Sequence, residues 1–312
     1  MDIIRTLDAV TPDQTGSIAA IGNFDGVHLG HRAVIGEAGR LAKESGHKLS
    51  VLTFEPHPRA FFQPDGIPFR LTSSQTRAAK LASIGIDLLF ELPFDRAFAE
   101  ITAEDFVDRV LFKELDFAHV VVGYDFNYGH RRRGTPEMLV ERARASGRGA
   151  TRLDAIHETD GAVYSSTRAR QCLMEGDPRG AASILGSPWD VIGVVERGDQ
   201  RGRTIGFPTA NLRFGDLLTP HHGVYSVRAK LLDEPGARWM PAVANVGRRP
   251  TVNDRGVLLE VHLLDLEMDL YDRKLAVRFF DFIRPEKKFD GLDALKAQIS
   301  SDAEHARSLL AG

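Results

Sequence analysis

Residues 18–31 read IAAIGNFDGVHLGH, an apolar run that passes into a turn rich in glycine and histidine. The run at residues 18–24 predicts a β-strand, and residues 30–44 have the periodicity of an amphipathic helix. A strand that passes through a tight turn into a helix is the start of a βαβ unit. We therefore expect residues 18–44 to belong to an α/β module built on a parallel sheet.

Strands and helices continue to alternate as far as residue 123. Strands separated by about ten to fifteen helical residues are typical of a parallel sheet covered by helices. Thr102 is a suitable N-cap for the last helix of this part, with Asp105 three residues later. Further strands are expected at residues 49–54, 88–92 and 119–123, and helices at residues 74–83 and 103–115.

The pattern changes after residue 183, where Gly186, Ser187 and Pro188 interrupt the chain. Short segments of alternating hydrophobicity follow, separated by turns that contain glycine, and a helix with an apolar stripe closes the sequence at residues 292–310. We expect an antiparallel β-barrel or sandwich with a terminal helix, and we place the module boundary at 185/186. The expected strands lie at residues 190–197, 224–232, 240–246, 257–266 and 275–283.

The composition is that of a globular enzyme or binding protein. Its 312 residues are too many for a single small domain with one hydrophobic core and are enough for two modules. A net charge of −3 gives no bulk attraction for nucleic acid, and Cys172 is the single cysteine, so no intrachain disulfide forms. No apolar run reaches the about 18 residues of a membrane span, and residues 1–17 lack the apolar core of a secretion signal. We expect a cytoplasmic protein that binds neither nucleic acid nor membrane.

The junction at residues 22–31 has the composition of a phosphate site. In an open α/β sheet, ligands bind at the carboxyl ends of the strands, where a helix N-terminus presents N–H groups and partial positive charge. Gly26 and Gly30 allow close approach to the backbone, and His28 and His31 can donate hydrogen bonds to phosphoryl oxygens. A tight turn with two surface histidines is the alternative. Zinc is a weaker one, because this His-x-x-His pair has no cysteine nearby.

Three other segments carry polar and aromatic side chains. Residues 53–58 (TFEPHP) and 123–129 (GYDFNYG) follow two of the expected strands. Aromatic rings at such an edge could stack on a planar ligand, although packing is their commoner use. Residues 164–170 (YSSTRAR) combine hydroxyl groups with two arginines at an expected helix start. Phosphate binding and N-capping by Ser166 or Thr167 explain this segment equally well.

In the second module, residues 198–211 read GDQRGRTIGFPTAN. The segment is neither a P-loop nor a dinucleotide fingerprint, but its glycines could present consecutive N–H groups to a phosphate. Thr209 and Asn211 lie two apart in an extended stretch, so their side chains share one side and offer oxygen ligands for a hard cation. A glycine-rich hairpin explains the segment as well. Glu260 falls on the less apolar side of the strand at residues 257–264, where a solvated carboxylate is the default expectation.

Together these residues resemble the bacterial bifunctional riboflavin kinase/FAD synthetase family. The first module, with GNFDGVHLGH at residues 22–31 and SSTRAR at residues 165–170, is similar to the family's FMN adenylyltransferase, a Rossmann-like nucleotidyltransferase domain. The resemblance implies that His28 and His31 stabilise charge at the α-phosphate of ATP while the phosphate of FMN attacks in line and pyrophosphate leaves. It implies ATP or FMN contacts at Gly22, Phe24, Asp25, Gly30, Phe54, His57, Asp125, Ser166, Thr167 and Arg170.

The second module resembles the riboflavin kinase of the same family, whose hallmark PTAN stands at residues 208–211. The resemblance implies an antiparallel β-barrel domain in which Thr209 and Asn211 hold Mg²⁺ and the phosphates of ATP. It makes Glu260 the general base for the ribityl 5′-hydroxyl of riboflavin. Further ATP or riboflavin contacts are implied at Gly202, Gly206 and Asn245.

The resemblance covers residues 18–310. It implies an adenylyltransferase domain at residues 1–185 and a kinase domain at residues 186–312, which convert riboflavin to FMN and FMN to FAD with ATP and Mg²⁺. Small-molecule substrates are the implied partners, and a weak homo-oligomer is left open. Two alternatives stay open: a flavin sensor without activity, and an adenylyltransferase for another substrate with a regulatory barrel. The intact histidine pair, Thr209, Asn211 and Glu260 oppose the first, and PTAN opposes the second.

Overall fold

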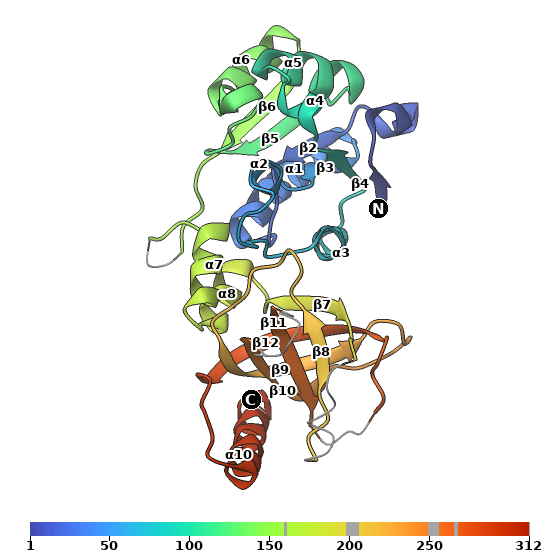
Figure 1. Ribbon diagram of the computed structural model, residues 1–312. Helices are drawn as coiled ribbons and strands as arrows, with labels where there is room; N and C mark the ends of the chain where they lie inside the picture. The colour runs from blue at the N-terminus through green and yellow to red at the C-terminus, as the bar shows by residue number, and fades with distance from the viewer. Residues whose placement is uncertain (159–160, 198–205, 249–255, 265–267, 312) are drawn as a thin grey trace. The chain divides into compact units, whose positions relative to one another are not determined.

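The computed structural model describes residues 1–158, 161–197, 206–248, 256–264 and 268–311 (Figure 1). Contacts between residues divide the chain into two compact units. The first unit consists of Met1–Gly66 and Ser74–Ser165, and the second consists of Ile67–Ser73 and Ser166–Gly312. No helix in the described ranges is both long and apolar enough to span a membrane.

The first unit is built on a six-stranded sheet in the order β1-β4-β3-β2-β5-β6, and every neighbouring pair is parallel. The strands are β1 (Asp2–Ile4), β2 (Ile18–Ile21), β3 (Leu49–Glu55), β4 (Leu88–Pro93), β5 (His119–Gly123) and β6 (Gly149–Leu153). The helices are η1 (Leu7–Ala9), η2 (Pro12–Gln14), α1 (Leu29–Ser45), α2 (Pro58–Phe62), α3 (Ser74–Ile84), α4 (Arg96–Ala99), α5 (Ala103–Asp105), η3 (Phe106–Glu114), η4 (His130–Arg132) and α6 (Pro136–Ala145).

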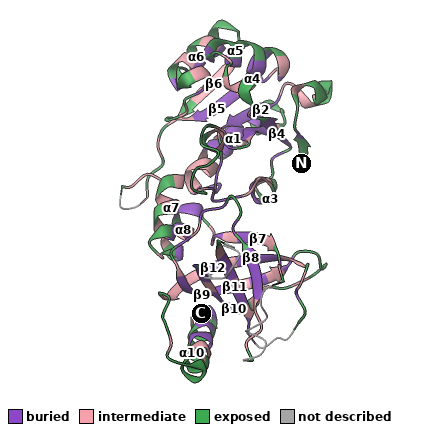
Figure 2. Cartoon of the chain, in the orientation of Figure 1, coloured by how far each residue is buried: buried purple, intermediate pink, exposed green. Residues whose placement is uncertain are grey.

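Helices cover both faces of this sheet, whose central strands are buried (Figure 2). Alternate residues of β2 show the two sides. Ile18 and Ala20 belong to a core cluster that includes side chains of α1 and α3, whereas Ala19 and Ile21 belong to a second cluster with side chains of η3 and α6. Burial on both faces explains why these strands read as continuous apolar runs. The predicted parallel α/β sheet is confirmed.

Some elements differ from those expected. β2 ends at Ile21 and not at residue 24, because Phe24 and Val27 have φ angles of 50° and 49°, in the left-handed region. The helix expected at residues 103–115 consists of α5, whose N-cap hydroxyl of Thr102 accepts a hydrogen bond from the Asp105 amide at 3.0 Å, followed by the π-helix η3. The sequence patterns do not predict β1, β6 or α6.

The second unit is built on an antiparallel sheet in the order β7-β12-β9-β10-β11-β8. The amide of Glu196, just beyond β7, donates to the carbonyl of Asn211 in β8 at 2.8 Å, which joins the two edge strands and closes the sheet into a barrel. The predicted barrel with a terminal helix is confirmed. Its elements are α7 (Ser166–Met174), α8 (Pro178–Leu185), β7 (Asp190–Val194), β8 (Ala210–Arg213), β9 (Gly223–Leu231), β10 (Met240–Arg248), β11 (Val257–Leu263), β12 (Lys274–Arg284) and α10 (Leu292–Ala311).

Residues 67–73 belong to the second unit, although they lie between β3 and β4 in the sequence. Arg70 forms a parallel bridge with Leu217. The buried indole of Trp189 donates from Nε1 to the carbonyl of Leu71 at 2.8 Å. Helices α7 and α8 also fall in this unit, whereas the boundary expected at 185/186 assigns them and residues 67–73 to the first module.

An ion pair fastens α10 to the barrel. Arg284 donates to the carboxylate of Asp302 from Nε at 3.0 Å and from Nη2 at 2.7 Å, and Asp302 is 3% exposed. We expect Asp302→Ala to lower the free energy of unfolding of the second unit by about 2 kcal/mol, because it leaves a poorly solvated guanidinium without its partner. The cost stays below that of a fully buried pair because Arg284 keeps some contact with water.

Both tryptophans, Trp189 and Trp239, lie in the second unit, so urea unfolding followed by tryptophan fluorescence measures its stability selectively. Asp293→Ala, at an exposed position of the same helix, is the control. Equal losses of stability in the Asp302 and Asp293 variants would contradict the anchoring role of the ion pair.

Candidate active sites

His28 and His31 meet at the N-terminus of α1. His28 is the N-cap of this helix, and its Nδ1 accepts a hydrogen bond from the amide of His31 at 3.2 Å. The two imidazole rings stack with their centroids 3.5 Å apart and their planes at 24°. Because Nδ1 of His28 accepts, the proton of its neutral ring is on Nε2.

The turn before α1 holds these rings closely. Phe24 is 1% exposed, and its ring meets that of His31 edge-on at 5.2 Å. A Cβ on Gly30 would lie 3.1 Å from the ring of His28 and 3.2 Å from the carbonyl oxygen of Tyr164, so a side chain there would displace the histidine or the backbone. The turn also contains the predicted residues Gly22 and Asp25, the latter buried.

The electrostatics at this point suit a phosphate group. The first amides of the 17-residue helix α1 have no partner within the helix and carry the positive end of its dipole. Two imidazoles at the same helix end add N–H donors of the kind that bind phosphoryl oxygens. The predicted phosphate site therefore has both a backbone and a side-chain component.

The loop after β3 begins at the same edge of the sheet. β2 and β3 are neighbours, with Ile21 paired to Leu52 and the amide of Gly22 donating to the carbonyl of Leu52 at 3.1 Å. His57 is the N-cap of α2, accepts from the amide of Arg59 at 3.1 Å through Nδ1, and is 9% exposed. The structure thus brings the His57 loop and the turn with the histidine pair to neighbouring strand ends.

Asp125 follows β5, which is the neighbour of β2 on its other side. Its side chain is exposed, and its carbonyl accepts a hydrogen bond from Nδ2 of Asn127 at 2.9 Å. The loops after β3, β2 and β5 therefore leave three consecutive strands at one edge, which is where open α/β sheets bind ligands.

An aromatic cluster lies at this edge and extends well beyond the aromatics of residues 123–129. Phe54 at the end of β3 contacts Phe94 and Phe98, with ring centroids 5.9 and 5.2 Å apart. One member, Phe62, is 65% exposed. The phenylalanines at residues 54–62 are the sequence signal for it. The cluster consists of Phe54, Phe61, Phe62, Phe94, Phe98, Phe106, Phe126 and Tyr128.

The predicted phosphate contacts Ser166, Thr167 and Arg170 lie on α7, within the second unit. Ser166 is the first residue of the helix, and Thr167 is exposed. Nε of Arg170 donates to the carbonyl of Phe69 at 2.7 Å, and its guanidinium lies 5.3 Å from the centroid of the Phe69 ring. Their participation in one site with the histidine pair stays a prediction.

In the barrel, three predicted residues are neighbours on adjacent strands. Glu260 of β11 is paired with Asn211 of β8 on one side and with Asn245 of β10 on the other. Directly opposite residues of antiparallel strands project to the same face, with Cβ atoms about 5 Å apart. A carboxylate flanked by two amides therefore forms one row, which we call the barrel row. This register supports Glu260 far better than its strand periodicity does.

Asn211 is suited to a cation or to a donor group of a ligand. It is 5% exposed, and its Oδ1 is buried without a hydrogen-bond partner in the described part of the chain. A buried oxygen without a partner lowers the stability of the folded protein by about 1–3 kcal/mol, and a bound ion or hydrogen-bond donor would remove this penalty. The half-buried Thr209 precedes β8 and adds a hydroxyl, so the pair offers the oxygen ligands that Mg²⁺ prefers. Gly206 is exposed, and Gly202 lies outside the described residues.

Glu286 adds a second carboxylate beside the barrel row, and the predicted set does not include it. A Cβ on Gly247 would overlap the carboxylate of Glu286 and would lie 3.3 Å from Nδ2 of Asn245, so both side chains lie over this glycine. Nδ1 of His222 is 3.9 Å from Oε2 of Glu286. Within the described ranges, no group of three or more His, Cys, Asp or Glu side chains is arranged to hold a metal ion.

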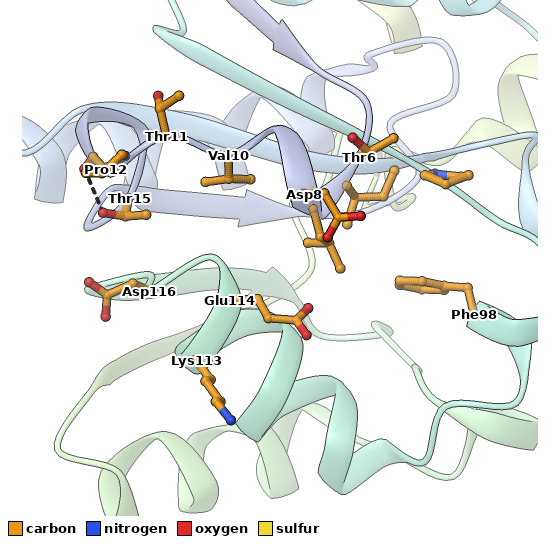
Figure 3. A pocket seen from close by; sticks show the side chains of 13 residues that line it. Thr6, Asp8, Val10, Thr11, Pro12, Thr15, Phe98, Lys113, Glu114 and Asp116 are labelled. Atoms are coloured by element: carbon orange, nitrogen blue, oxygen red, sulfur yellow. Dashed lines mark hydrogen bonds between the residues drawn. The ribbon is translucent and has the colours of Figure 1, made fainter.

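The first unit also has an open cavity of about 730 Å³ (Figure 3). The N-terminal segment lines one side of it, including Thr6 and Asp8, and the end of η3 lines the other, with Lys113 and Glu114. None of the predicted site residues lines this cavity. The predicted site residues therefore lie outside this cavity.

Two family models match separate parts of the chain. The model described as FAD synthetase matches residues 10–168, and the model described as riboflavin kinase matches residues 185–310. Each match contains one of the candidate sites: the histidine pair lies in the first and the barrel row lies in the second.

Curated relatives match the chain over nearly its full length. A bifunctional riboflavin kinase/FMN adenylyltransferase of Pseudomonas fluorescens is 39% identical over 312 residues, which cover 100% of this chain and 98% of the relative. Proteins of the same name from Escherichia coli K12 and Bacillus subtilis are 41% and 34% identical, over 98% and 95% of this chain and 97% and 93% of their own lengths.

A solved structure described as a macrolide-efflux protein from Streptococcus pneumoniae has a TM-score of 0.85 to this chain, at 30% identity and with 98% of each chain covered. Its description names an efflux function, whereas the two family models and these curated relatives are described as flavin enzymes. Since both family models match in the expected order and the relatives extend over the whole chain, the protein belongs to the bifunctional riboflavin kinase/FMN adenylyltransferase family.

Proposed function

We propose that this bifunctional enzyme divides its two reactions between separate parts of the chain. It phosphorylates riboflavin to FMN with ATP, and it adenylylates FMN to FAD with a second ATP, releasing pyrophosphate. We assign adenylyl transfer to residues 1–185 and phosphoryl transfer to residues 186–312. The supporting observation is that the histidine pair lies at the start of α1, the helix that follows β2 of the parallel sheet, whereas the barrel row lies on strands of the antiparallel sheet.

In adenylyl transfer, the phosphate of FMN attacks the α-phosphorus of ATP and pyrophosphate leaves from the opposite side. Negative charge grows on the α-phosphoryl oxygens as the new bond forms. The proposed donors to those oxygens are Nε2–H of His28, the ring of His31 and the amides of Leu29 and Gly30, which begin α1. No covalent enzyme intermediate is needed, because positioning and charge stabilisation supply the catalysis. His57 and Asp125, on the flanking loops, are the proposed ATP and FMN contacts.

We assign the isoalloxazine ring of FMN to the aromatic cluster. Exposed aromatic rings bind planar ligands by stacking, and Phe62 exposes 65% of its surface at the edge where the histidine pair lies. Phe54, a proposed ligand contact, is 7% exposed and contacts Phe94, whose ring in turn contacts that of Phe62, so Phe54 also supports the exposed ring through Phe94.

In phosphoryl transfer, the ribityl 5′-hydroxyl of riboflavin attacks the γ-phosphorus of ATP. Glu260 is the proposed base that accepts the hydroxyl proton, and Asn211 and Asn245 flank it on the two adjacent strands of the barrel row. Thr209 and Asn211 are the proposed ligands of Mg²⁺. When bound, this ion neutralises charge on the phosphates of ATP. The buried Oδ1 of Asn211 fits that role because it has no partner among the described residues.

Asn211→Leu is expected to weaken binding of Mg²⁺-ATP by at least about tenfold, because it replaces the ligand oxygen with an apolar group of similar size. The KM for Mg²⁺-ATP in riboflavin phosphorylation measures the effect at this site alone. FMN-to-FAD conversion is the internal control and should stay unchanged. An unaltered KM for Mg²⁺-ATP in a folded Asn211→Leu protein would remove Asn211 from the metal site.

The proposed pair of reactions has a direct test. Purified protein is incubated with riboflavin, ATP and Mg²⁺, and the flavins are separated chromatographically over time. FMN should rise first and FAD should follow. A second incubation that starts from FMN isolates the adenylyl transfer step, and absence of FMN or FAD formation in either incubation would refute the corresponding assignment.

We also propose that the enzyme works in the cytoplasm, where ATP is supplied for both steps. The net charge of −3 is consistent with partners that are small molecules rather than nucleic acid or a membrane surface. The local glycines, histidines and amides described above handle the anionic phosphates, so a strongly basic chain is not required.

A further inference from the structure

Arg77 of α3 is a buried guanidinium at the carboxyl ends of three neighbouring strands. It is 0% exposed. Its Nη1 donates to the carbonyl of Asn23, just beyond β2, at 3.2 Å. Its Nη2 lies 3.2 Å from the carbonyl of Phe54 and 2.9 Å from the carboxylate of Glu55, both at the end of β3, and 2.9 Å from the carboxylate of Glu91 in β4.

The carbonyl of Asn23 is held from a second side. The hydroxyl of Thr53 in β3 donates to it at 3.1 Å, so this one oxygen accepts both from a guanidinium and from a hydroxyl. Asn23 directly precedes Phe24, which has a left-handed φ of 50° and places its ring 5.2 Å from that of His31. The orientation of the Asn23 peptide therefore affects the position of the Phe24 ring, which contacts the ring of His31.

Arg77 itself is fixed through Glu91. This carboxyl group is 4% exposed and also accepts from the hydroxyl of Ser74 at 2.7 Å, with Nε of Arg5 at 3.4 Å. Burial raises the pKa of Glu91. The hydrogen bonds from Ser74 and Arg77 and the nearby charge of Arg5 lower it by more than burial raises it, so the pKa lies below the ordinary value. The pair is ionised, and its charges balance within the core.

A buried ion pair contributes little net stability, because desolvation offsets most of the attraction. The planar fork of the guanidinium does something that a hydrophobic side chain does not: it fixes several acceptors at once in a set geometry. Here the acceptors belong to the turn that carries the histidine pair and to the strand end that begins the His57 loop.

We propose that Arg77 is a positioning residue for adenylyl transfer: it locks the turn with the histidine pair to the loop with His57, and Thr53 supports it at the carbonyl of Asn23. The inference rests on the proposed placement of the adenylyl transfer site. A displacement of catalytic groups by about 1 Å costs about 100-fold in rate. Arg77→Lys keeps the charge beside Glu91 but loses the fork, so FAD formation from FMN should fall by about 100-fold while riboflavin phosphorylation stays unchanged.

Thr53→Val provides a test that removes no buried charge. It deletes one hydrogen bond to the carbonyl of Asn23, and FAD formation should fall by about three- to tenfold, a smaller share of the same positioning loss. Ser50→Ala is its matched control. Ser50 is also fully buried in β3, and its hydroxyl donates to a β2 carbonyl, that of Ile18, at 3.2 Å, but at the end of the strands away from the turn.

Two readouts separate positioning from a loss of folded protein. The rate of riboflavin phosphorylation measures how much of the enzyme is folded. The imidazole NMR signals of His28 and His31 measure changes in the conformation of the turn that carries them. We expect these signals to shift in Arg77→Lys and in Thr53→Val and to stay unchanged in Ser50→Ala. The kcat for FAD formation should fall more than the KM for ATP rises.

The double variant His28→Ala/His31→Ala is measured alongside these proteins. If it retains FAD formation, the placement of the site is wrong. If it loses FAD formation while Arg77→Lys and Thr53→Val stay within about twofold of wild type, the site stands and the positioning role of Arg77 is overturned. Equal effects of Thr53→Val and Ser50→Ala on FAD formation would overturn it as well, and this comparison decides the question if Arg77→Lys fails to fold.

Discussion

Replacement of both His28 and His31 by alanine is expected to make FMN accumulate while FAD formation falls by at least about 1,000-fold. The two rings are stacked 3.5 Å apart at the N-terminus of α1, so both act at the same point of the phosphate chain. Loss of one preorganised donor to a developing oxyanion costs about 10²–10³ in kcat, and the double variant removes two. The barrel row is unchanged, so riboflavin phosphorylation continues.

The measurement is a time course of riboflavin, FMN and FAD by chromatography. His28→Asn tests whether the effect is chemical, because asparagine keeps an acceptor at the N-cap position and removes only the imidazole. We expect it to lose FAD formation without loss of stability. His47→Ala, at an exposed position just after the same helix, is the control. FAD formation at the wild-type rate in His28→Asn would mean that His28 serves only as a cap.

Glu260→Gln is expected to lower riboflavin phosphorylation by about 10²–10⁴ and to leave the conversion of supplied FMN to FAD intact. A positioned general base contributes a factor of this size, and glutamine keeps the size and shape of the side chain between Asn211 and Asn245 while it removes the basic carboxylate. The rate of FMN formation from riboflavin at saturating Mg²⁺-ATP measures the effect.

Glu286→Gln is the matched control for this variant, because Glu286 is the other carboxylate beside Asn245. It should retain riboflavin phosphorylation within about tenfold, since it is not the proposed base. If Glu286→Gln loses the activity and Glu260→Gln keeps it, the base is Glu286. If both variants lose FAD formation from FMN while remaining folded, the assignment of the two reactions to separate sheets is wrong.

The sequence predicts the architecture well because both sheets bury their strands in regular patterns. The βαβ alternation and the change to short alternating strands identify the two folds before any contact is known. The local geometry of the histidine turn is less accessible, because the left-handed Phe24 and Val27 are stabilised by packing within the turn and not by their own preferences. The π-helix η3 likewise has no signature that distinguishes it from the expected α-helix.

Some residues of the candidate sites can be predicted from the sequence and others cannot, depending on whether their role is visible in a local motif. His28, His31, Thr209 and Asn211 stand in local motifs, and local motifs are visible in a sequence. The neighbours of Glu260 depend on the register of three strands, which no single segment specifies. Arg77 is the extreme case: in the polar sequence of α3 it reads as a solvent-facing residue, and its burial follows only from the acceptors that β2, β3 and β4 bring to it.

Residues 67–73 also bear on how the protein is made. They leave the ribosome 118 residues ahead of the tryptophan whose indole binds the carbonyl of Leu71. Domains generally fold from the N-terminus onward during synthesis. In this protein, part of the second unit is synthesised before the first unit is complete, and it can pack only after the barrel strands have been made. For the same reason, a recombination event that exchanged only the C-terminal half of the gene would bring in a barrel without the segment that it packs against.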